Sequence, residues 1–202
     1  MKKILLGFIL SVILIGSSFA AEGDIKLPEP QKTGGKPLME ALSLRSSHRE
    51  FSGKEFDPQT ISNVLWSAFG INRDGVKKRT IPTAKNEQNL SVYALLPSGM
   101  YFYNSEANKL EIISSEDYRA DAGKQTDMLE KTAMILVYAE KLGDSYSKFN
   151  TGAAAQNVGL YAASADLGNV VIGYANIKEL GEVLKLPKGM QVQVIQALGY
   201  KN

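Results

Sequence analysis

The chain has 202 residues, with 23 Lys and Arg, 21 Asp and Glu, one His and no Cys, and its formal net charge is +2. This composition excludes disulfides and any zinc site of the usual Cys/His kind, and a near-neutral charge gives no electrostatic reason to bind nucleic acid. A Ser-His-Asp triad would have to use His48, and neither a P-loop nor a G-x-G-x-x-G pattern occurs. If the chain carries out chemistry, a bound cofactor supplies it.

Residues 1–20 predict a secretory signal peptide. Two lysines precede an apolar run at 4–15, and a Ser-x-Ala site follows at 18–20. The run is shorter than the roughly 20 apolar residues that span a membrane, so we expect no stable membrane insertion once the signal is removed. Cleavage after Ala20 would lower the net charge to zero and release the protein into the periplasm or outside the cell.

The remaining sequence predicts an extended lead-in at 21–36 and one domain at 37–202. Apolar residues at helical or alternating spacing, with Asp, Pro and Gly at the ends of elements, define the expected helices and strands. The expected helices are 37–44, 58–69 (between Asp57 and Gly70), a stretch opening at 116–121, 150–167 (capped by Gly168) and 177–184; the expected strands are 90–96, 100–103, 109–113, 132–139, 170–173 and 191–198. Without regular strand–helix alternation, this order predicts an α+β fold with a central, mostly antiparallel sheet flanked by helices.

A basic cluster, Arg45-Ser46-Ser47-His48-Arg49-Glu50-Phe51, directly follows the first expected helix. Arg45 and Arg49 present rigid forks of N–H donors and the serines add hydroxyls, a set that suits a phosphate dianion. The alternative is that these cations only offset the helix dipole and are solvated, which is the more common case for surface Arg. The cluster alone therefore leaves both interpretations open.

Two later stretches resemble a known family together with this cluster. They are T-I-P-T-A-K-N-E-Q at 80–88 and the Ala-rich stretch at 152–173, which ends in G-N-V-V-I-G. In this order, the three resemble the phosphate cluster, the P-[ST]-A-x-N-x-Q motif and the dimer helix with its following loop in the nitroreductase family of FMN-dependent oxidoreductases. The exported, SagB/ThcOx-like members are the most similar, and the resemblance covers about residues 36–201.

The resemblance implies FMN as the cofactor. The cluster at 45–49 would hold the phosphate and the ribityl chain, and Lys201 would add a further cation. Asn86, with Gln88 as a weaker candidate, would hydrogen-bond the isoalloxazine edge, and the backbone at 172–173 would bring an N–H to flavin N5. Each also has an ordinary structural interpretation: Asn86 as a turn residue, Gly173 as a strand terminator and Lys201 as a solvated tail. The implied cofactor-binding residues are Arg45, Ser46, Ser47, Arg49, Asn86, Gln88, Ile172, Gly173 and Lys201.

The implied function is that of an exported FMN-dependent oxidoreductase. Ping-pong transfer would carry two electrons from a reduced donor to a quinone, nitro compound or other small organic acceptor, with the flavin rather than a side chain as the reacting group. No metal is assigned. The resemblance also implies a homodimer with flavin at the subunit interface. The alternatives are a non-catalytic protein of the same fold that binds a flavin or small ligand, and a structural relative that has lost the flavin.

Overall fold

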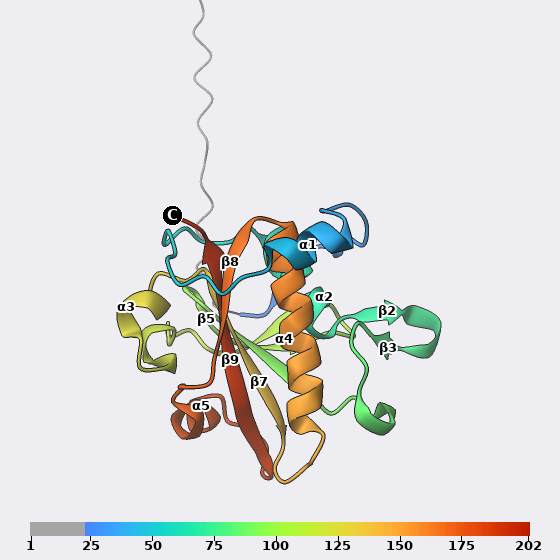
Figure 1. Ribbon diagram of the computed structural model, residues 1–202. Helices are drawn as coiled ribbons and strands as arrows, with labels where there is room; N and C mark the ends of the chain where they lie inside the picture. The colour runs from blue at the N-terminus through green and yellow to red at the C-terminus, as the bar shows by residue number, and fades with distance from the viewer. Residues whose placement is uncertain (1–22) are drawn as a thin grey trace, which may run out of the picture.

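The computed structural model describes residues 23–202, so the predicted signal peptide at 1–20 lies outside the described residues. Within that range, a seven-stranded sheet forms in which all neighbouring strands are antiparallel (Figure 1). In spatial order its strands are β1 (Ile25–Lys26), β6 (Lys109–Ser114), β5 (Gly99–Asn104), β4 (Ser91–Leu96), β7 (Met134–Lys141), β9 (Met190–Tyr200) and β8 (Leu167–Ile172). A separate hairpin pairs β2 (Ile71–Arg73) with β3 (Lys78–Arg79). The predicted α+β fold with a mostly antiparallel sheet is confirmed.

Helices cover both faces of the sheet. The helices are α1 (Leu38–Leu44), α2 (Pro58–Phe69), α3 (Thr126–Leu129), α4 (Ser147–Ser164) and α5 (Ile177–Val183), with single 3-10 turns η1 (Asp74–Val76), η2 (Ala84–Asn86) and η3 (Ala120–Ala122). Apolar side chains of α2 and α4 share one core with the sheet, and those of α3 and α5 share the other. Figure 1 shows α4 lying lengthwise across the front of the sheet. None of the helices in residues 23–202 is long and apolar enough to cross a membrane.

The side chains of β7 alternate between the two cores. Leu136 and Tyr138 belong to the core under α4, whereas Ile135 and Val137 belong to the core under α5. This alternation follows from the two-residue period of a strand. All four side chains are fully buried. The buried strand predicted at 132–139 is therefore confirmed, although it begins and ends two residues later.

Helix α2 begins and ends where its sequence predicts. The side chain of Asp57 accepts a hydrogen bond of 2.9 Å from the backbone N–H of Thr60, and Pro58 occupies the first helical position. At the other end, Gly70 lies so close to the ring and carbonyl of Trp66 that a Cβ atom there would overlap them. Capping and close packing thus fix both ends of this helix.

The prediction that Gly168 caps the Ala-rich helix is wrong. Helix α4 ends at Ser164, the chain reverses at Asp166 with a left-handed φ of 57°, and Gly168 lies inside β8, which begins three residues before the expected strand. A Cβ atom at Gly168 would lie 2.7 Å from Cδ2 of His48, so this glycine allows another segment to cross the strand. Gly199, which pairs with Gly168 in the sheet, likewise leaves space for Phe51 to pack against β9.

Two further segments differ from expectation. The stretch opening at 116–121 forms only η3 and, after a break, the one-turn helix α3; before η3, the carboxylate of Asp117 accepts hydrogen bonds from the backbone and guanidinium of Arg119 in a local loop. The lead-in at 21–36 contributes the short edge strand β1, which pairs with β6. Leu27, just after β1, is buried in the α4-side core. The lead-in is thus partly built into the sheet.

Candidate functional site

The basic cluster runs over the ends of β8 and β9. His48 N–H donates a hydrogen bond of 2.8 Å to the carbonyl of Asn169, and the side-chain amide of Asn169 donates one of 3.4 Å to the carbonyl of Ser46. Phe51, which is buried, forms an antiparallel bridge with Lys201. The structure therefore brings Lys201 beside the cluster, as the family resemblance implies.

The cations of this region are available to an external anion. Arg45, Arg49 and Lys201 are exposed, and within residues 23–202 none of their side chains forms an ion pair or donates a hydrogen bond. Ser46 and Ser47 are also exposed and add hydroxyl donors. Two guanidinium forks, an ammonium group and two hydroxyls form a donor set that fits a phosphate dianion.

A buried group of neutral side chains supports the cluster from below. Gln196 of β9 is fully buried; its Nε2 donates to the carbonyl of Ala155 at 3.1 Å and to Oδ1 of Asn169 at 3.2 Å, and its Oε1 accepts from the hydroxyl of Tyr138 at 2.7 Å. We call Tyr138, Gln196 and Asn169 the amide network. Because Asn169 binds both Gln196 and the carbonyl of Ser46, this network connects the sheet to the cluster. Polar residues inside otherwise apolar strands are the signal that could have predicted the amide network, but the sequence analysis did not identify it.

The loop that carries Asn86 has an unusual backbone. Lys85, Asn86 and Gln88 have positive φ angles of 51°, 58° and 51°. Asn adopts this region more readily than most residues, but such a run is uncommon and tends to occur at functional sites. Gln88 accepts a hydrogen bond of 2.8 Å from Nε of Arg79 and donates one of 3.3 Å to Oδ1 of Asn86. Gln88 thus orients the amide of Asn86, which is exposed.

A second buried polar group holds this loop. The backbone N–H of Ala84 donates to Oδ1 of Asn150 at 3.2 Å, and Nδ2 of Asn150 donates to Oε2 of Glu140 at 3.2 Å. We call Glu140 and Asn150 the carboxylate network. Burial, the largest cause, and the negative charge of Asp144 together raise the pKa of Glu140 to about 7, against the hydrogen bond from Asn150, which lowers it. Sequence reasoning missed both residues, although a Glu directly after the apolar run 132–139 was a visible signal.

The predicted site residues do not all meet within one chain. Arg45 packs against α4 at Gly159, whereas Ala84 binds α4 at Asn150. These positions are nine residues apart, or about 14 Å along the helix axis. The cluster and the loop of Asn86 therefore lie near opposite ends of α4 (Figure 1).

The end of β8 is open on one side. The side chain of Ile172 is buried, while Gly173 is exposed and a Cβ atom added there would meet nothing within 4 Å. The family resemblance implies that the backbone at 172–173 approaches the flavin closely. The free space beside Gly173 is compatible with that role.

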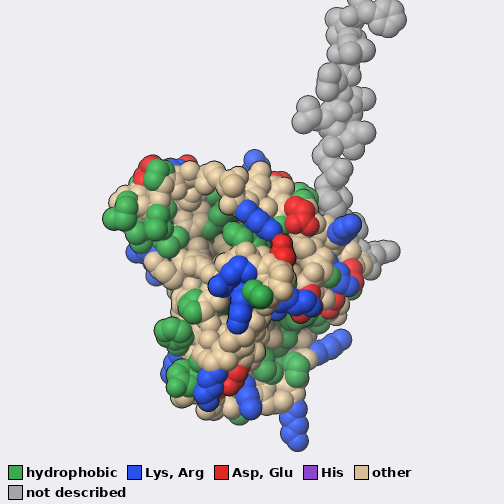
Figure 2. Space-filling view, turned by 90° about the vertical axis from the view of Figure 1, so that its right-hand side faces the viewer, with side chains coloured by type: hydrophobic (Ala, Val, Ile, Leu, Met, Phe, Trp, Pro, Cys, Tyr) green, Lys and Arg blue, Asp and Glu red, His purple; other side chains and the backbone are tan. Residues whose placement is uncertain are grey.

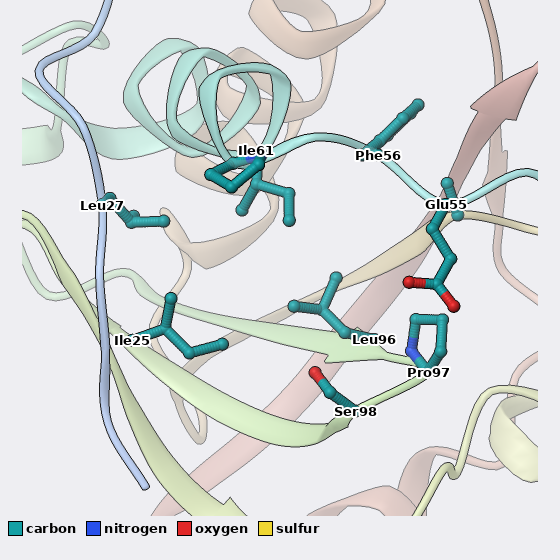
Figure 3. A pocket seen from close by; sticks show the side chains of 10 residues that line it. Ile25, Leu27, Glu55, Phe56, Ile61, Leu96, Pro97 and Ser98 are labelled. Carbon is teal, nitrogen blue, oxygen red and sulfur yellow. The ribbon is translucent and has the colours of Figure 1, made fainter. Parts of the chain in front are cut away.

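A mainly apolar pocket lies away from the predicted cofactor-binding residues. The pocket in Figure 3 has a volume of about 500 Å³ including its open mouth, and it lies between the lead-in, α2 and the turn after β4. Its lining is mainly apolar, with Glu55 at one side (Figure 3). None of the predicted cofactor-binding residues lines this pocket or the four other hollows described on residues 23–202. The cluster at 45–49, Asn86, Gly173 and Lys201 lie on the exposed surface of this chain instead.

Exposed apolar side chains accompany this surface. Helix α1, which leads into the cluster, exposes Leu38, Met39, Leu42 and Leu44, with Met39 75% exposed. Figure 2 shows hydrophobic side chains gathered at the upper left edge of the molecule, at the level of α1. Phe149, in the first turn of α4, is also exposed. Apolar surface thus lies near both ends of α4.

Comparison with known proteins identifies the family. The Nitroreductase family model matches residues 42–200. A crystal structure from Ralstonia eutropha JMP134, named as a candidate nitroreductase, is 33% identical, with a TM-score of 0.83 over 92% of each chain. A protein of Methanocaldococcus jannaschii, named in the same way, is 25% identical over 81% of this chain and 90% of its own length. A nitroreductase candidate from Anabaena variabilis has a TM-score of 0.75 at 18% identity; the match covers 96% of this chain but 45% of that one. The protein described here therefore belongs to the nitroreductase family, and membership supports an oxidoreductase of the nitroreductase type.

Proposed function

We propose that the protein is an FMN-dependent oxidoreductase that moves two electrons from a reduced donor to a quinone, a nitro compound or another small organic acceptor. The observation that carries this proposal is that the segment of Arg45 and Arg49 lies beside Lys201, through the bridge between Phe51 and Lys201, and that none of the three cations forms an ion pair in residues 23–202. When bound, FMN supplies the hydride chemistry that the protein's own side chains lack. Family membership supports the reaction type, and the donor set supports the phosphate-bearing cofactor.

The cluster would bind the phosphate end of the cofactor. Arg45 and Arg49 can each donate two parallel hydrogen bonds to phosphate oxygens, and Lys201 adds a point charge. The hydroxyls of Ser46 and Ser47 would complete the donor set. The amide network fixes the backbone at Ser46 through Asn169, so the segment that carries these donors is positioned before the cofactor arrives.

Two other segments would orient the ring. Asn86, held by Gln88, can match the donors and acceptors of the isoalloxazine edge. The backbone after Ile172 would donate an N–H, and Gly173 leaves the space that this approach needs. None of these groups has to act as a nucleophile or proton donor.

We further propose that the protein acts as a homodimer. The separation of about 14 Å between the cluster and the Asn86 loop along α4 favours a site to which two subunits contribute. The exposed apolar side chains of α1 and the first turn of α4 lie where such a contact would bury them. The sequence of residues 1–20 supports export, with the mature protein in the periplasm or outside the cell.

Flavin binding by the mature chain, residues 21–202, tests the proposal. FMN should bind much more tightly than riboflavin, which lacks the phosphate, and Arg45→Ala should weaken FMN binding on the order of 10- to 100-fold. A control is Lys188→Ala, which removes an exposed cation that forms no ion pair in residues 23–202. Equal affinity for both flavins would show that the cluster is ordinary surface charge.

Turnover separates an enzyme from a carrier. The yellow protein, reduced with dithionite or NADH, should be reoxidised by quinones or nitroaromatics faster than free FMN is. If the protein binds FMN but no acceptor reacts faster than with free FMN, the non-catalytic alternative replaces the enzyme.

A further inference from the structure

Glu140 is a buried carboxylate that the proposed reaction does not use. It follows Leu136 and Tyr138 on the α4 side of β7, where its side chain is fully buried. Its Oε2 accepts from Asn150, but its Oε1 has no hydrogen-bond partner in residues 23–202. Buried polar atoms of Thr151 and Gln193 are also unpartnered within the described residues. A buried ionisable group with an unsatisfied oxygen weakens the core relative to an apolar side chain, so its presence calls for another role.

Asn150 transmits the effect of Glu140 to the backbone of the loop. Its Nδ2 donates to Glu140, and its Oδ1 accepts from the N–H of Ala84. An ionised carboxylate can only accept hydrogen bonds, so it holds the amide with Nδ2 toward the sheet and Oδ1 toward the loop. A flipped amide would point its donors at the N–H of Ala84 and break the contact.

Ala84 is the first residue of the turn that ends at Asn86. The N–H of Asn86 donates to the carbonyl of Thr83, and the N–H of Glu87 donates to the carbonyl of Ala84, both at 3.0 Å. The position of Ala84 thus determines the position of the turn and of the exposed amide of Asn86. We propose that Glu140 is a positioning residue, which as a carboxylate fixes the amide of Asn150 and through it the loop that presents Asn86. This inference rests on the proposed function only for the role of Asn86 toward the flavin.

The arrangement makes the loop sensitive to pH. The side chain bonded to Glu140 is the neutral amide of Asn150, which also donates to the neutral amide of Asn89, and Asp144 is the charged group that acts on Glu140. Because the pKa of Glu140 is raised to about 7, its charge changes around neutral pH. Protonation supplies a second donor to the network and loosens the hold on the Asn150 amide.

Hydrogen exchange of the Ala84 amide in flavin-free protein tests the relay directly. In Glu140→Gln, whose amide can either donate or accept, the protection factor of this amide at pH 8 should fall on the order of fivefold, as expected for one neutral hydrogen bond. Asn150→Ala should give at least the same loss. The control Glu87→Gln removes an exposed charge from the same loop and should leave the protection unchanged. Equal protection in wild type, Glu140→Gln and Asn150→Ala would overturn the inference.

The pH dependence provides a readout that a merely structural role would not change. Wild-type protection of Ala84, corrected for intrinsic exchange, should decrease as the pH falls through about 7, and Glu140→Gln should show no such step. Asp144→Asn removes the neighbouring negative charge, so it should move the step to lower pH. A step that persists in Glu140→Gln, or that Asp144→Asn does not move, would show that another group controls the loop.

FMN titrations separate this inference from the proposed function. If the relay positions a ring contact, the FMN dissociation constant of wild type should rise on the order of fivefold from pH 8 to pH 6 and that of Glu140→Gln should change less. A protein that binds no FMN at any pH contradicts the proposed function, while the exchange data still decide the relay. A protein that binds FMN without any response of Ala84 contradicts the relay alone.

Discussion

Two polar networks of opposite character connect α4 to the sheet, one at Ala155 in the middle of the helix and one at Asn150 in its first turn. The amide network of Tyr138, Gln196 and Asn169 is neutral, and each of its side-chain polar atoms has a partner. The carboxylate network of Glu140 and Asn150 contains an ionisable group and an unpartnered oxygen. The first can hold the basic cluster in the same way at any physiological pH, whereas the second, in the relay proposed above, makes the hold on the Asn86 loop depend on the protonation of Glu140. Completeness of hydrogen bonding, rather than burial, distinguishes a fixed support from a responsive one.

The largest effect should come from Glu140→Gln. The pKa of Glu140 is raised by burial from 4.5 to about 7 in the folded protein, so between these values the folded state binds more protons than the unfolded state. This contribution to the free energy of unfolding therefore falls as the pH rises from 5 to 8, by about 3 kcal/mol. Glu140→Gln should lose that slope and be more stable than wild type at pH 8.

Urea denaturation at pH 5 and pH 8 measures both proteins. Carboxyls with lowered pKa values, such as Asp24 and Glu111, lose their contribution below their usual range and so leave this window unaffected. Equal slopes for wild type and Glu140→Gln would contradict the contrast between the two networks.

The next effect concerns the amide network. Gln196→Leu keeps the approximate side-chain volume but leaves the hydroxyl of Tyr138 and Oδ1 of Asn169 without their partner. Unmade buried hydrogen bonds should lower the free energy of unfolding by about 2 kcal/mol. The loss should be the same at pH 5 and pH 8, since no group of this network titrates there. Urea denaturation of Gln196→Leu at both pH values measures this loss. A loss that depends on pH would contradict the contrast between the amide and carboxylate networks.

A smaller effect should follow from Gly168→Ala. The added Cβ atom would lie 2.7 Å from the ring of His48 and 3.1 Å from Cε1 of Phe51, so the segment that carries the cluster must shift. We expect a loss of about 1 kcal/mol in stability together with weaker FMN binding. Gly152→Ala is the matched control, because its Cβ would meet nothing within 4 Å on an exposed helix face and should stabilise α4 slightly. Calorimetry measures the stability of both variants, and FMN titration measures their affinity. Equal stability and affinity in the two variants would show that close packing at Gly168 does not hold the cluster in place.

The smallest effect on affinity should come from Asn86→Gly, which keeps the left-handed backbone accessible while removing the amide. FMN affinity should fall less than about fivefold, because the loss is one neutral contact and the phosphate donors remain. Turnover with a quinone should fall more than affinity. Stopped-flow reduction and reoxidation distinguish the two, and unchanged turnover would remove Asn86 from the ring contacts.

The sequence predicted features that depend on neighbouring residues. Asp57 and Pro58 specify the start of α2 by capping, and the apolar run at 132–139 specifies a buried strand. Gly168 was misread because a glycine beyond a helix and a glycine under a crossing segment look alike until the segment 120 residues upstream is placed. The amide and carboxylate networks were missed for the same reason, since their partners come from different strands and helices. The cluster and Lys201 were linked through family resemblance, and the bridge between Phe51 and Lys201 provides the physical link.

That bridge also sets an order in time for the assembly of the site. The cluster is among the first parts of the domain to be synthesised, but the strands on which it lies, β8 and β9, are made last. Contacts between residues so far apart in sequence form late and slow the folding of a chain. A ribosome-bound or truncated chain that lacks β9 therefore contains both arginines of the cluster but not the strand that positions them. If the cluster binds FMN as proposed, flavin uptake should therefore begin only after β8 and β9 have formed.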